Sequence, residues 1–496
     1  MAYNGYITTL KNVRPHPNAD RLQLGECFGN TVCVNLDYKN EQIGVYFPTD
    51  GQLSVEFCEY NNLVRKKDEN GNNIGGYMDP DKRNVTSIRL RGEKSDGLFL
   101  PLTCLEFTEI DLSTLNVGDI INVVNGHEIC KKYIPRRNHR QGGYSNGNRT
   151  RKHKEPIAPL FVEHADTEQL AYNLAAFKPG DEIEITLKMH GTSQRTGYLP
   201  VFKGYNDSFW CNVKNTFRHI LNKMEMYCGN KKIESEIQHD GEPIYDWDYI
   251  SGTRRVVLDS YDGGFYGSNE FREQHSKIFE GKLWKGETVY YEVVGFTHTG
   301  APIMSTADNK KLNDKEFIKQ YGKETVFSYG CEPYGICASA KADPNYNTPV
   351  SDIYIYRMTM TNEDGHVVEY TPDFMRYRCE QMGIKTVPVM WKGVIPEYKP
   401  HQLWTTEEIN DDIPGFRPKI DAGEYVKWLA EQYYDGPDPI GKTHIREGVV
   451  VRILNRPKFC AYKHKNFNFK VLEGIVKADA IAPDMEEAQE EENNGI

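Results

Sequence analysis

A run of basic residues that contains no acidic residue divides the chain into two unlike parts. Residues 131–154 (KKYIPRRNHRQGGYSNGNRTRKHK) carry nine Lys or Arg and no Asp or Glu. Before this run, short β segments such as GYITTL, TVCVNL and IGVYFP alternate with Gly, Pro and Asn. After it, longer strands such as EIEITLK and REGVVVRI are separated by helical or irregular stretches. A chain of 496 residues is too long for one ordinary core, so we expect an α+β protein with more than one domain.

The pattern predicts four segments. Residues 1–128 read as a small all-β barrel, and 129–158 as a basic flexible linker. Residues 159–477 form the larger α+β part, interrupted by insertions at 204–245 and 396–440 whose role the sequence leaves open. The acidic tail, 478–496, is expected to be disordered. Within the larger part, one helix is expected to be capped by Thr371, to have Pro372 in its first turn and to end at Gly383. A second helix is expected around 422–434.

Charge and cysteine usage narrow the class of protein. The net charge is −11, yet the basic run could contact RNA through Arg136, Arg137 and Arg140 or could be only a solvated linker, and both alternatives stay open. The eleven cysteines are scattered without a CxxC pair, which favours free thiols in a reducing cytoplasm. No apolar run approaches 18 residues and the first residues lack the layout of a secretory signal, so neither a membrane span nor secretion is expected.

The segment ITLKMHGTSQRTG, residues 185–197, carries the most chemistry. A strand delivers Lys188, and Gly191 permits close approach of the backbone to a ligand. A lysine amine attacks phosphorus only when it is deprotonated, and burial or nearby cations favour that form. Lys94-Ser95-Asp96-Gly97 matches the commoner K-x-D-G pattern more literally, but its position in the small β part predicts an ordinary hairpin turn.

The context of Lys188 resembles the covalent nucleotidyltransferase superfamily, and within it the ATP-dependent RNA ligases, several of which use K-x-H-G-T. It is most similar to the fifth RNA ligase family, and Phe161–Gln169 (FVEHADTEQ) and the OB-like heptapeptide His16–Leu22 add to the likeness. The heptapeptide could also be only a Pro/Asn turn before a strand. The resemblance implies an N-terminal OB-like β-barrel followed by an ATP-grasp-like, DNA-ligase-type nucleotidyltransferase domain of antiparallel sheets and helices.

The resemblance also implies roles for later residues that follow in the order of the superfamily motifs. Glu292 would contact the ribose hydroxyls or a metal, Tyr356 would stack on adenine, and Glu447 would face the metal. Lys463 and Lys465 would clamp the α-phosphate and the departing pyrophosphate, with Lys470 as a possible further phosphate ligand. Each of these could singly be an ordinary strand or surface residue, and their joint, ordered occurrence favours the functional interpretation.

Other contacts to the nucleotide are expected near these motifs. Leu187, Met189, His190 and Gly191 flank the nucleophile, and adenine contacts at Leu187 must come from the backbone. Arg254 is expected to bind AMP or the 5′-phosphate of RNA, with Arg195 as a second candidate, although either could simply pair with surface acids. Arg357 stands where relatives have Asp, which leaves base selectivity open.

The sequence therefore predicts an enzyme that uses ATP and Mg²⁺ or Mn²⁺ to join a 3′-hydroxyl and a 5′-phosphate of RNA in a nicked duplex. AMP would pass from ATP to Lys188, then to the 5′-phosphate, and would leave when the 3′-hydroxyl attacks. The alternatives are a DNA ligase or mRNA-capping guanylyltransferase, and a non-catalytic OB-type RNA-binding protein. Only 31 residues follow Lys465, too few for the OB domain expected there in the first alternative. A monomer is expected, while the natural RNA and the oligomeric state stay open.

Overall fold

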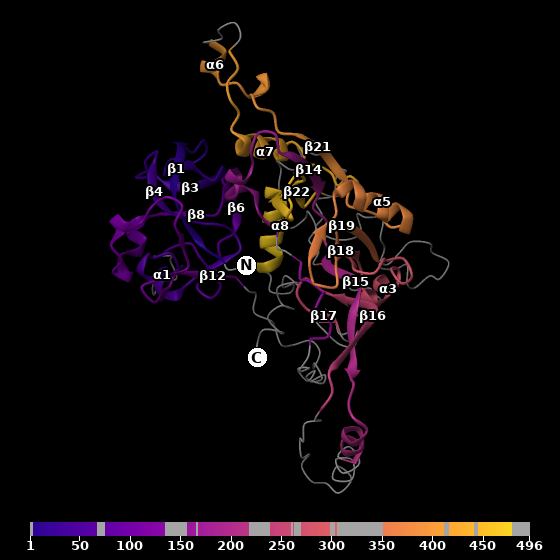
Figure 1. The fold of residues 1–496 in the computed structure, drawn as a ribbon. Coiled ribbons are helices and arrows are strands. Elements are labelled where there is room, and N and C mark those ends of the chain that lie inside the picture. The colour runs from indigo at the N-terminus through magenta and orange to yellow at the C-terminus, as the bar shows by residue number, and fades with distance from the viewer. Residues whose placement is uncertain are drawn as a thin grey trace, which may run out of the picture.

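The computed structural model is a mixed α and β structure in which most regular elements are strands (Figure 1). It describes residues 3–66, 75–133, 156–164, 167–217, 239–258, 261, 269–297, 303–304, 351–410, 416–440 and 445–478. Arg136, Arg137, Arg140 and residues 479–496 lie outside these ranges. None of the helices described is long and apolar enough to cross a membrane.

The N-terminal part is built on one curved sheet. Its strand order is β3-β2-β1-β4-β8, and β9 also pairs with β1. The strands are β1 (Gly5–Pro15), β2 (Leu22–Cys27), β3 (Asn30–Asn35), β4 (Gln42–Phe47), β8 (Leu98–Pro101) and β9 (Ile120–Ile121). Alternate residues such as Ile7, Val45 and Phe47 point inward and pack with Phe57 of helix α1 (Val55–Tyr60). The remaining short strands are β5 (Gly51–Leu53), β10 (Val123–Val124), β11 (His127–Glu128) and β12 (Cys130–Lys132).

The segment Lys94–Gly97 is not the turn that the sequence predicted. Strands β6 (Ser87–Leu90) and β7 (Glu93–Asp96) form a two-stranded hairpin, and Lys94 pairs with Arg89 within it. The turn lies at Arg91 and Gly92, both at positive φ, since φ is 46° and 94° there. Asp96 ends the strand and is buried.

The second part contains two larger antiparallel sheets. In the five-stranded sheet, order β13-β23-β22-β14-β21, only the β13–β23 pair is parallel. Its strands are β13 (Glu168–Gln169), β14 (Glu182–Leu187), β21 (Val389–Val394), β22 (Gly448–Ile453) and β23 (Cys460–Lys465). The six-stranded sheet has the order β17-β16-β15-β18-β19-β20. Its strands are β15 (Thr192–Tyr205), β16 (Pro243–Gly252), β17 (Val257–Leu258), β18 (Glu287–Gly295), β19 (Ser351–Thr361) and β20 (Val367–Glu369).

Helices cover these sheets and form a core with each. Helices α3 (Glu270–Lys277) and α5 (Pro372–Met382) pack on the six-stranded sheet. Helix α7 (Ala422–Glu431) packs on the five-stranded sheet, and α8 (Phe467–Ala478) follows β23. Both predicted helices are confirmed: Thr371 caps α5, Gly383 ends it at φ 71°, and α7 begins after the capping residue Asp421.

Two extensions leave the second part in opposite directions in Figure 1. The antiparallel pair β15 and β16 is rooted near the pocket described below and runs outward to Tyr205, which pairs with Pro243. The other extension carries the short helix α6 (Thr406–Asn410). Helix α8 lies between the N-terminal part and the two larger sheets (Figure 1).

Candidate active site

A pocket of about 210 Å³ is lined by residues from both larger sheets and from the N-terminal part. Eleven of the residues singled out in the sequence line it: Leu187, Lys188, Met189, His190, Gly191, Arg254, Glu292, Tyr356, Glu447, Lys463 and Lys465. Strand register explains the convergence, because Leu187 lies opposite Val449, Val450 opposite Lys463, and Gly448 opposite Lys465. The ends of β14, β22 and β23 therefore meet at one side of the pocket.

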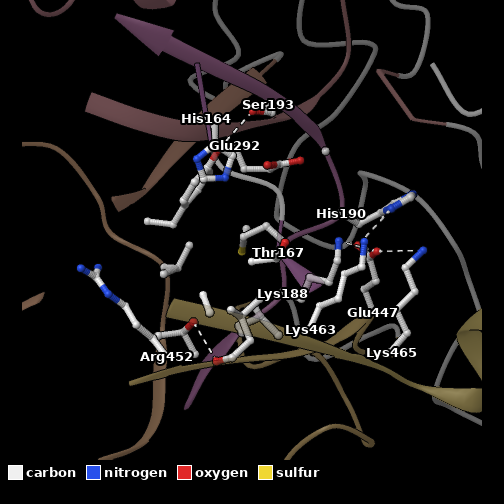
Figure 2. Close-up of a pocket in the computed structure, with 18 of the residues that line it drawn as sticks. His164, Thr167, Lys188, His190, Ser193, Glu292, Glu447, Arg452, Lys463 and Lys465 are labelled. Carbon is white, nitrogen blue, oxygen red and sulfur yellow. Dashed lines mark hydrogen bonds and ion pairs between the residues drawn. The ribbon is translucent and has the colours of Figure 1, made fainter. Parts of the chain in front are cut away.

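Glu447 is the centre of a cluster of cationic groups (Figure 2). Its Oε1 atom lies 2.6 Å from Nζ of Lys188 and 3.6 Å from Nζ of Lys465, and its Oε2 atom lies 3.5 Å from Nδ1 of His190. Burial by itself would raise the pKa of this carboxyl. The positive charge of Lys188, a hydrogen bond from His190 and the charge of Lys465 outweigh burial and hold the pKa of Glu447 well below its usual range. The cationic neighbours of Glu447 therefore favour its anionic form, which suits a carboxylate that binds a metal ion.

Lys463 is the third amine of this cluster, and its surroundings differ from those of Lys465. Burial, followed by repulsion from Lys465 and Lys188, lowers the pKa of Lys463 to about 8. In the described part of the chain, no carboxylate forms an ion pair with Lys463, whereas Lys465 contacts both Glu447 and Glu473. Concentrated positive charge of this kind favours a polyanionic ligand such as a triphosphate.

The six-stranded sheet supplies the opposite wall. Ser193 of β15 pairs with Glu292 of β18, and the Ser193 hydroxyl lies 3.1 Å from the Tyr356 hydroxyl of β19. The ring of His164 packs against Tyr356 at 5.2 Å between ring centroids. Figure 2 shows His164, Ser193 and Glu292 across the pocket from the lysines. This wall offers aromatic, hydroxyl and carboxylate groups, which can bind a base and a ribose.

The residues that flank Lys188 connect the two walls. A Cβ atom at Gly191 would lie 2.4 Å from the carbonyl oxygen of Val293, so the close passage of the chain at this point requires glycine. Leu187 and Met189 are buried with Val294 and Phe296, which anchors the chain on both sides of Lys188. Arg254 reaches the pocket from the segment between β16 and β17.

Two placements differ from the predictions. Arg195 does not line the pocket, because it is buried under the segment 161–162, where it donates hydrogen bonds to the carbonyl oxygens of Phe161 and Val162 and stacks on the Phe161 ring. Lys470 is not a phosphate ligand in this arrangement, because its Nζ atom lies 2.5 Å from Asp96. Arg357, for which no placement was predicted, forms an ion pair of 2.9 Å with Glu369 and contacts His164 of the pocket lining.

Sequence reasoning missed several residues that line the pocket. Asp50 and Lys132 come from the N-terminal part, Glu184 and Arg452 from the five-stranded sheet, and Glu473 from α8. His164 and Thr167 lie in the segment whose likeness was noted, but no role was predicted for them. The side-chain alternation of β14 could have indicated Glu184, which points to the same side of the strand as Lys188.

Comparison with known proteins finds similarity only among solved structures. No protein-family model and no curated protein matches the chain. A mutant of Naegleria gruberi RNA ligase with ATP and Mn is 16% identical, with 95% of this chain and 98% of that chain covered and a TM-score of 0.49. Another mutant of the same ligase, with AMP and Mn, is 15% identical, with coverage of 94% and 97% and a TM-score of 0.48. The form with PPi is also 15% identical, with coverage of 93% and 96% and a TM-score of 0.46. At these identities and TM-scores the likeness assigns neither a family nor a role to the chain.

Proposed function

We propose that the chain is an ATP-dependent RNA ligase that works through a lysyl–AMP intermediate on Lys188. The observation that carries the proposal is the convergence of Lys188, Glu447, Lys463 and Lys465 on one side of a pocket with Glu292 and Tyr356 on the other. These residues come from strands separated by up to 277 positions in the sequence, so chance does not explain their meeting. A triphosphate would lie along the lysines and the base would stack on Tyr356.

The first step follows from this geometry. After the ammonium group of Lys188 has released one proton, its Nζ attacks the α-phosphorus, and the bond from that phosphorus to the bridging oxygen of the β-phosphate breaks. Pyrophosphate leaves with that electron pair. A P–N bond forms, and the nitrogen gives up a second proton to solvent. Lys463 and Lys465 neutralise charge that develops on the phosphate oxygens, an effect that is strong in a buried site.

Mg²⁺ or Mn²⁺ fits this pocket, because these ions prefer carboxylate and phosphate oxygens and Glu447 and Glu292 both line it. When bound, the metal would neutralise phosphate charge and orient the leaving group. Glu447 suits this role, because its anionic form is already stabilised by its cationic neighbours.

The N-terminal sheet supports an RNA substrate. Five strands in the order β3-β2-β1-β4-β8, with β3 packed beside β7 and β8, are compatible with a partly open OB-like barrel, a fold that binds oligonucleotides. Lys132, at the end of β12 and near the start of the basic run, lines the pocket. We propose that residues 1–128 and the basic segment hold the RNA through its phosphates and that the ends to be joined reach the pocket from there.

The test has two stages. The protein is incubated with ATP or GTP and Mg²⁺ or Mn²⁺, and the mass of the peptide that contains Lys188 is measured. A gain of one adenylate from ATP alone is expected, and a gain from GTP alone would indicate a capping enzyme instead. Nicked duplexes with RNA or DNA on each side of the break then identify the polynucleotide. No nucleotide on Lys188 under any of these conditions would refute the proposal.

A further inference from the structure

Helix α8 contributes to the proposed active site an acidic residue, Glu473, that belongs to none of the motifs. Nζ of Lys465 donates hydrogen bonds to both carboxylate oxygens of Glu473, at 3.1 and 2.9 Å. The two side chains are only 14% and 7% exposed, and both line the pocket. A buried bidentate ion pair restrains a lysine side chain that would otherwise sample many rotamers.

The same helix is attached to the N-terminal part by polar contacts. Nζ of Lys470 lies 2.5 Å from Oδ2 of Asp96, and Arg89 donates a hydrogen bond of 2.9 Å to Asn468. The cationic groups of Arg89 and Lys94 lie over the Phe467 ring, at 5.5 and 5.2 Å from its centroid. The first half of α8 therefore packs on the β6–β7 hairpin.

The hairpin end of this connection is itself held in place. The Ser87 hydroxyl donates a hydrogen bond of 2.6 Å to Asp96, and the Tyr46 hydroxyl donates one of 2.7 Å to the Asp96 carbonyl oxygen. Lys470 and Glu473 are three residues apart in the helix and so lie on neighbouring parts of its surface. A shift of the hairpin would move Lys470 and Glu473 together.

Of the two carboxylates near Lys465, Glu473 is the nearer, and Glu447 also pairs with Lys188. Glu447 is 2.6 Å from Lys188 and 3.6 Å from Lys465, whereas Glu473 is closer to Lys465 than Glu447 is. Without the Glu473 carboxylate, Lys465 would turn to Glu447, the nearest remaining anion. That movement would withdraw Lys465 from the phosphates and would compete with Lys188 and a metal for Glu447.

We propose that Glu473 is a positioning residue that aims Lys465 at the nucleotide phosphates, and that Asp96 fixes it there by anchoring α8 through Lys470. The inference rests on the proposed function of Lys188 and deepens it, because it makes the N-terminal hairpin a determinant of nucleotidyl transfer. The K-S-D-G segment of that hairpin then has a role, although Lys94 is no nucleophile.

The first experiment measures the rate of Lys188 adenylylation against ATP concentration for the full chain and for Glu473→Gln, Lys465→Met and the double variant. Glu473→Gln is expected to slow adenylylation by about 10- to 100-fold, the usual loss when a group that orients a functional residue is removed. If Glu473 acts through Lys465, Glu473→Gln causes no further loss in the Lys465→Met background. An equal loss in both backgrounds, or a Glu473→Gln rate within twofold of wild type, would overturn the proposal.

Matched controls separate positioning from folding. Glu273→Gln removes a carboxylate from an exposed helical pair with Lys277 and is expected to leave the adenylylation rate unchanged. Glu473→Asp keeps the charge and is expected to recover part of the rate. The thermal unfolding temperature of every variant is measured, and the assays are run below the lowest of these temperatures, so that each variant is folded. If Glu473→Gln lowered the unfolding temperature without slowing adenylylation, the Lys465–Glu473 ion pair would be purely structural, and the proposal would be refuted.

The hairpin anchor is tested with Asp96→Asn and Lys470→Met. Each is expected to slow adenylylation several-fold, and Asp96→Asn is expected to add nothing in the Glu473→Gln background. Wild-type rates in both anchor variants would refute the role of the hairpin. Failure of this inference differs from failure of the proposed function, because the latter would leave the wild-type protein itself without adenylate on Lys188.

Discussion

Two segments of this chain carry nearly the same four-residue pattern and have opposite surroundings. Lys94-Ser95-Asp96-Gly97 lies in the N-terminal hairpin, where Lys94 is exposed and Asp96 is buried with Ser87 and Lys470. Lys188-Met189-His190-Gly191 joins the two larger sheets, where the lysine meets Glu447 at 2.6 Å. The less literal match to the K-x-D-G pattern is the one in the pocket. The comparison teaches that a nucleophile is identified by the groups that converge on it.

The largest expected difference between the two segments concerns the lysines themselves. Lys188→Met should reduce adenylylation on the order of 10⁴-fold or more, because it removes the attacking atom. Lys94→Met should slow adenylylation at most several-fold, because the side chain lies outside the pocket and its ammonium group meets α8 at the Phe467 ring. Mass spectrometry of the protein after incubation with ATP and Mn²⁺ measures both. The reverse result would exchange the roles of the two segments.

The acidic residues near the two lysines should differ less in their effect on the adenylylation rate than the lysines do. Glu447→Gln should slow adenylylation about 10²- to 10³-fold, because it removes the anion that faces the reacting phosphate and the metal. Asp96→Asn should cost only several-fold, because Asp96 acts through α8. Single-turnover rates at saturating ATP compare the two. Equal losses of rate would show that the hairpin carboxylate contributes as much to adenylylation as Glu447 does, which would contradict an indirect role for Asp96.

The buried positive charge of Lys463 should lower the free energy of unfolding, whereas the charge of the exposed Lys94 should not. Its pKa is lowered from 10.5 to about 8, so the folded protein releases this proton at lower pH than the unfolded chain does. Below pH 8 the buried charge destabilises the fold by on the order of 3 kcal/mol, and this cost falls as pH rises from 8 to 10.5. Lys463→Met should therefore stabilise the nucleotide-free protein at pH 7, with an advantage that shrinks at higher pH. Urea unfolding at pH 7 and 9.5 measures it, and an advantage that grows with pH would contradict the assignment.

The smallest expected effect concerns the second residue of the hairpin segment. The Ser95 hydroxyl accepts a hydrogen bond of 3.1 Å from the backbone N–H of Cys33. Ser95→Ala should cost about 1 kcal/mol of unfolding free energy and leave the adenylylation rate unchanged. Denaturant unfolding together with the rate assay checks this. A loss of rate at full stability would show that the hairpin influences the pocket by a route other than Asp96.

The parts of the site that could be predicted from sequence lie on strands with a regular pattern. Lys188, Glu292, Tyr356 and Glu447 each lie on or directly beside a strand that the apolar pattern indicated, whereas Lys463 was placed by the motif order alone. Arg195 lies on β15, a strand that the apolar pattern did not indicate, and it is covered by the segment 161–162, a contact that local sequence cannot predict.

Contacts between distant segments could not be predicted. Lys470 and Asp96 are 374 positions apart, so neither propensity nor spacing links them. Asp50 and Lys132 reach the pocket only because the N-terminal part is docked against α8 and the larger sheets. The small β part was predicted as a separate segment, and its contribution of side chains to the pocket depends on tertiary packing alone.

The antiparallel pair β15 and β16 has one end at the chemistry and the other far outside it. Ser193 near the inner end is held against Glu292, whereas Tyr205 and Pro243 pair at the outer end. Residues added between Tyr205 and Pro243 would lie at this outer end, and each doubling of a flexible loop costs only about 0.6 kcal/mol. Evolution or an engineer could therefore graft a recognition element onto this outer end while the reaction centre keeps its alignment.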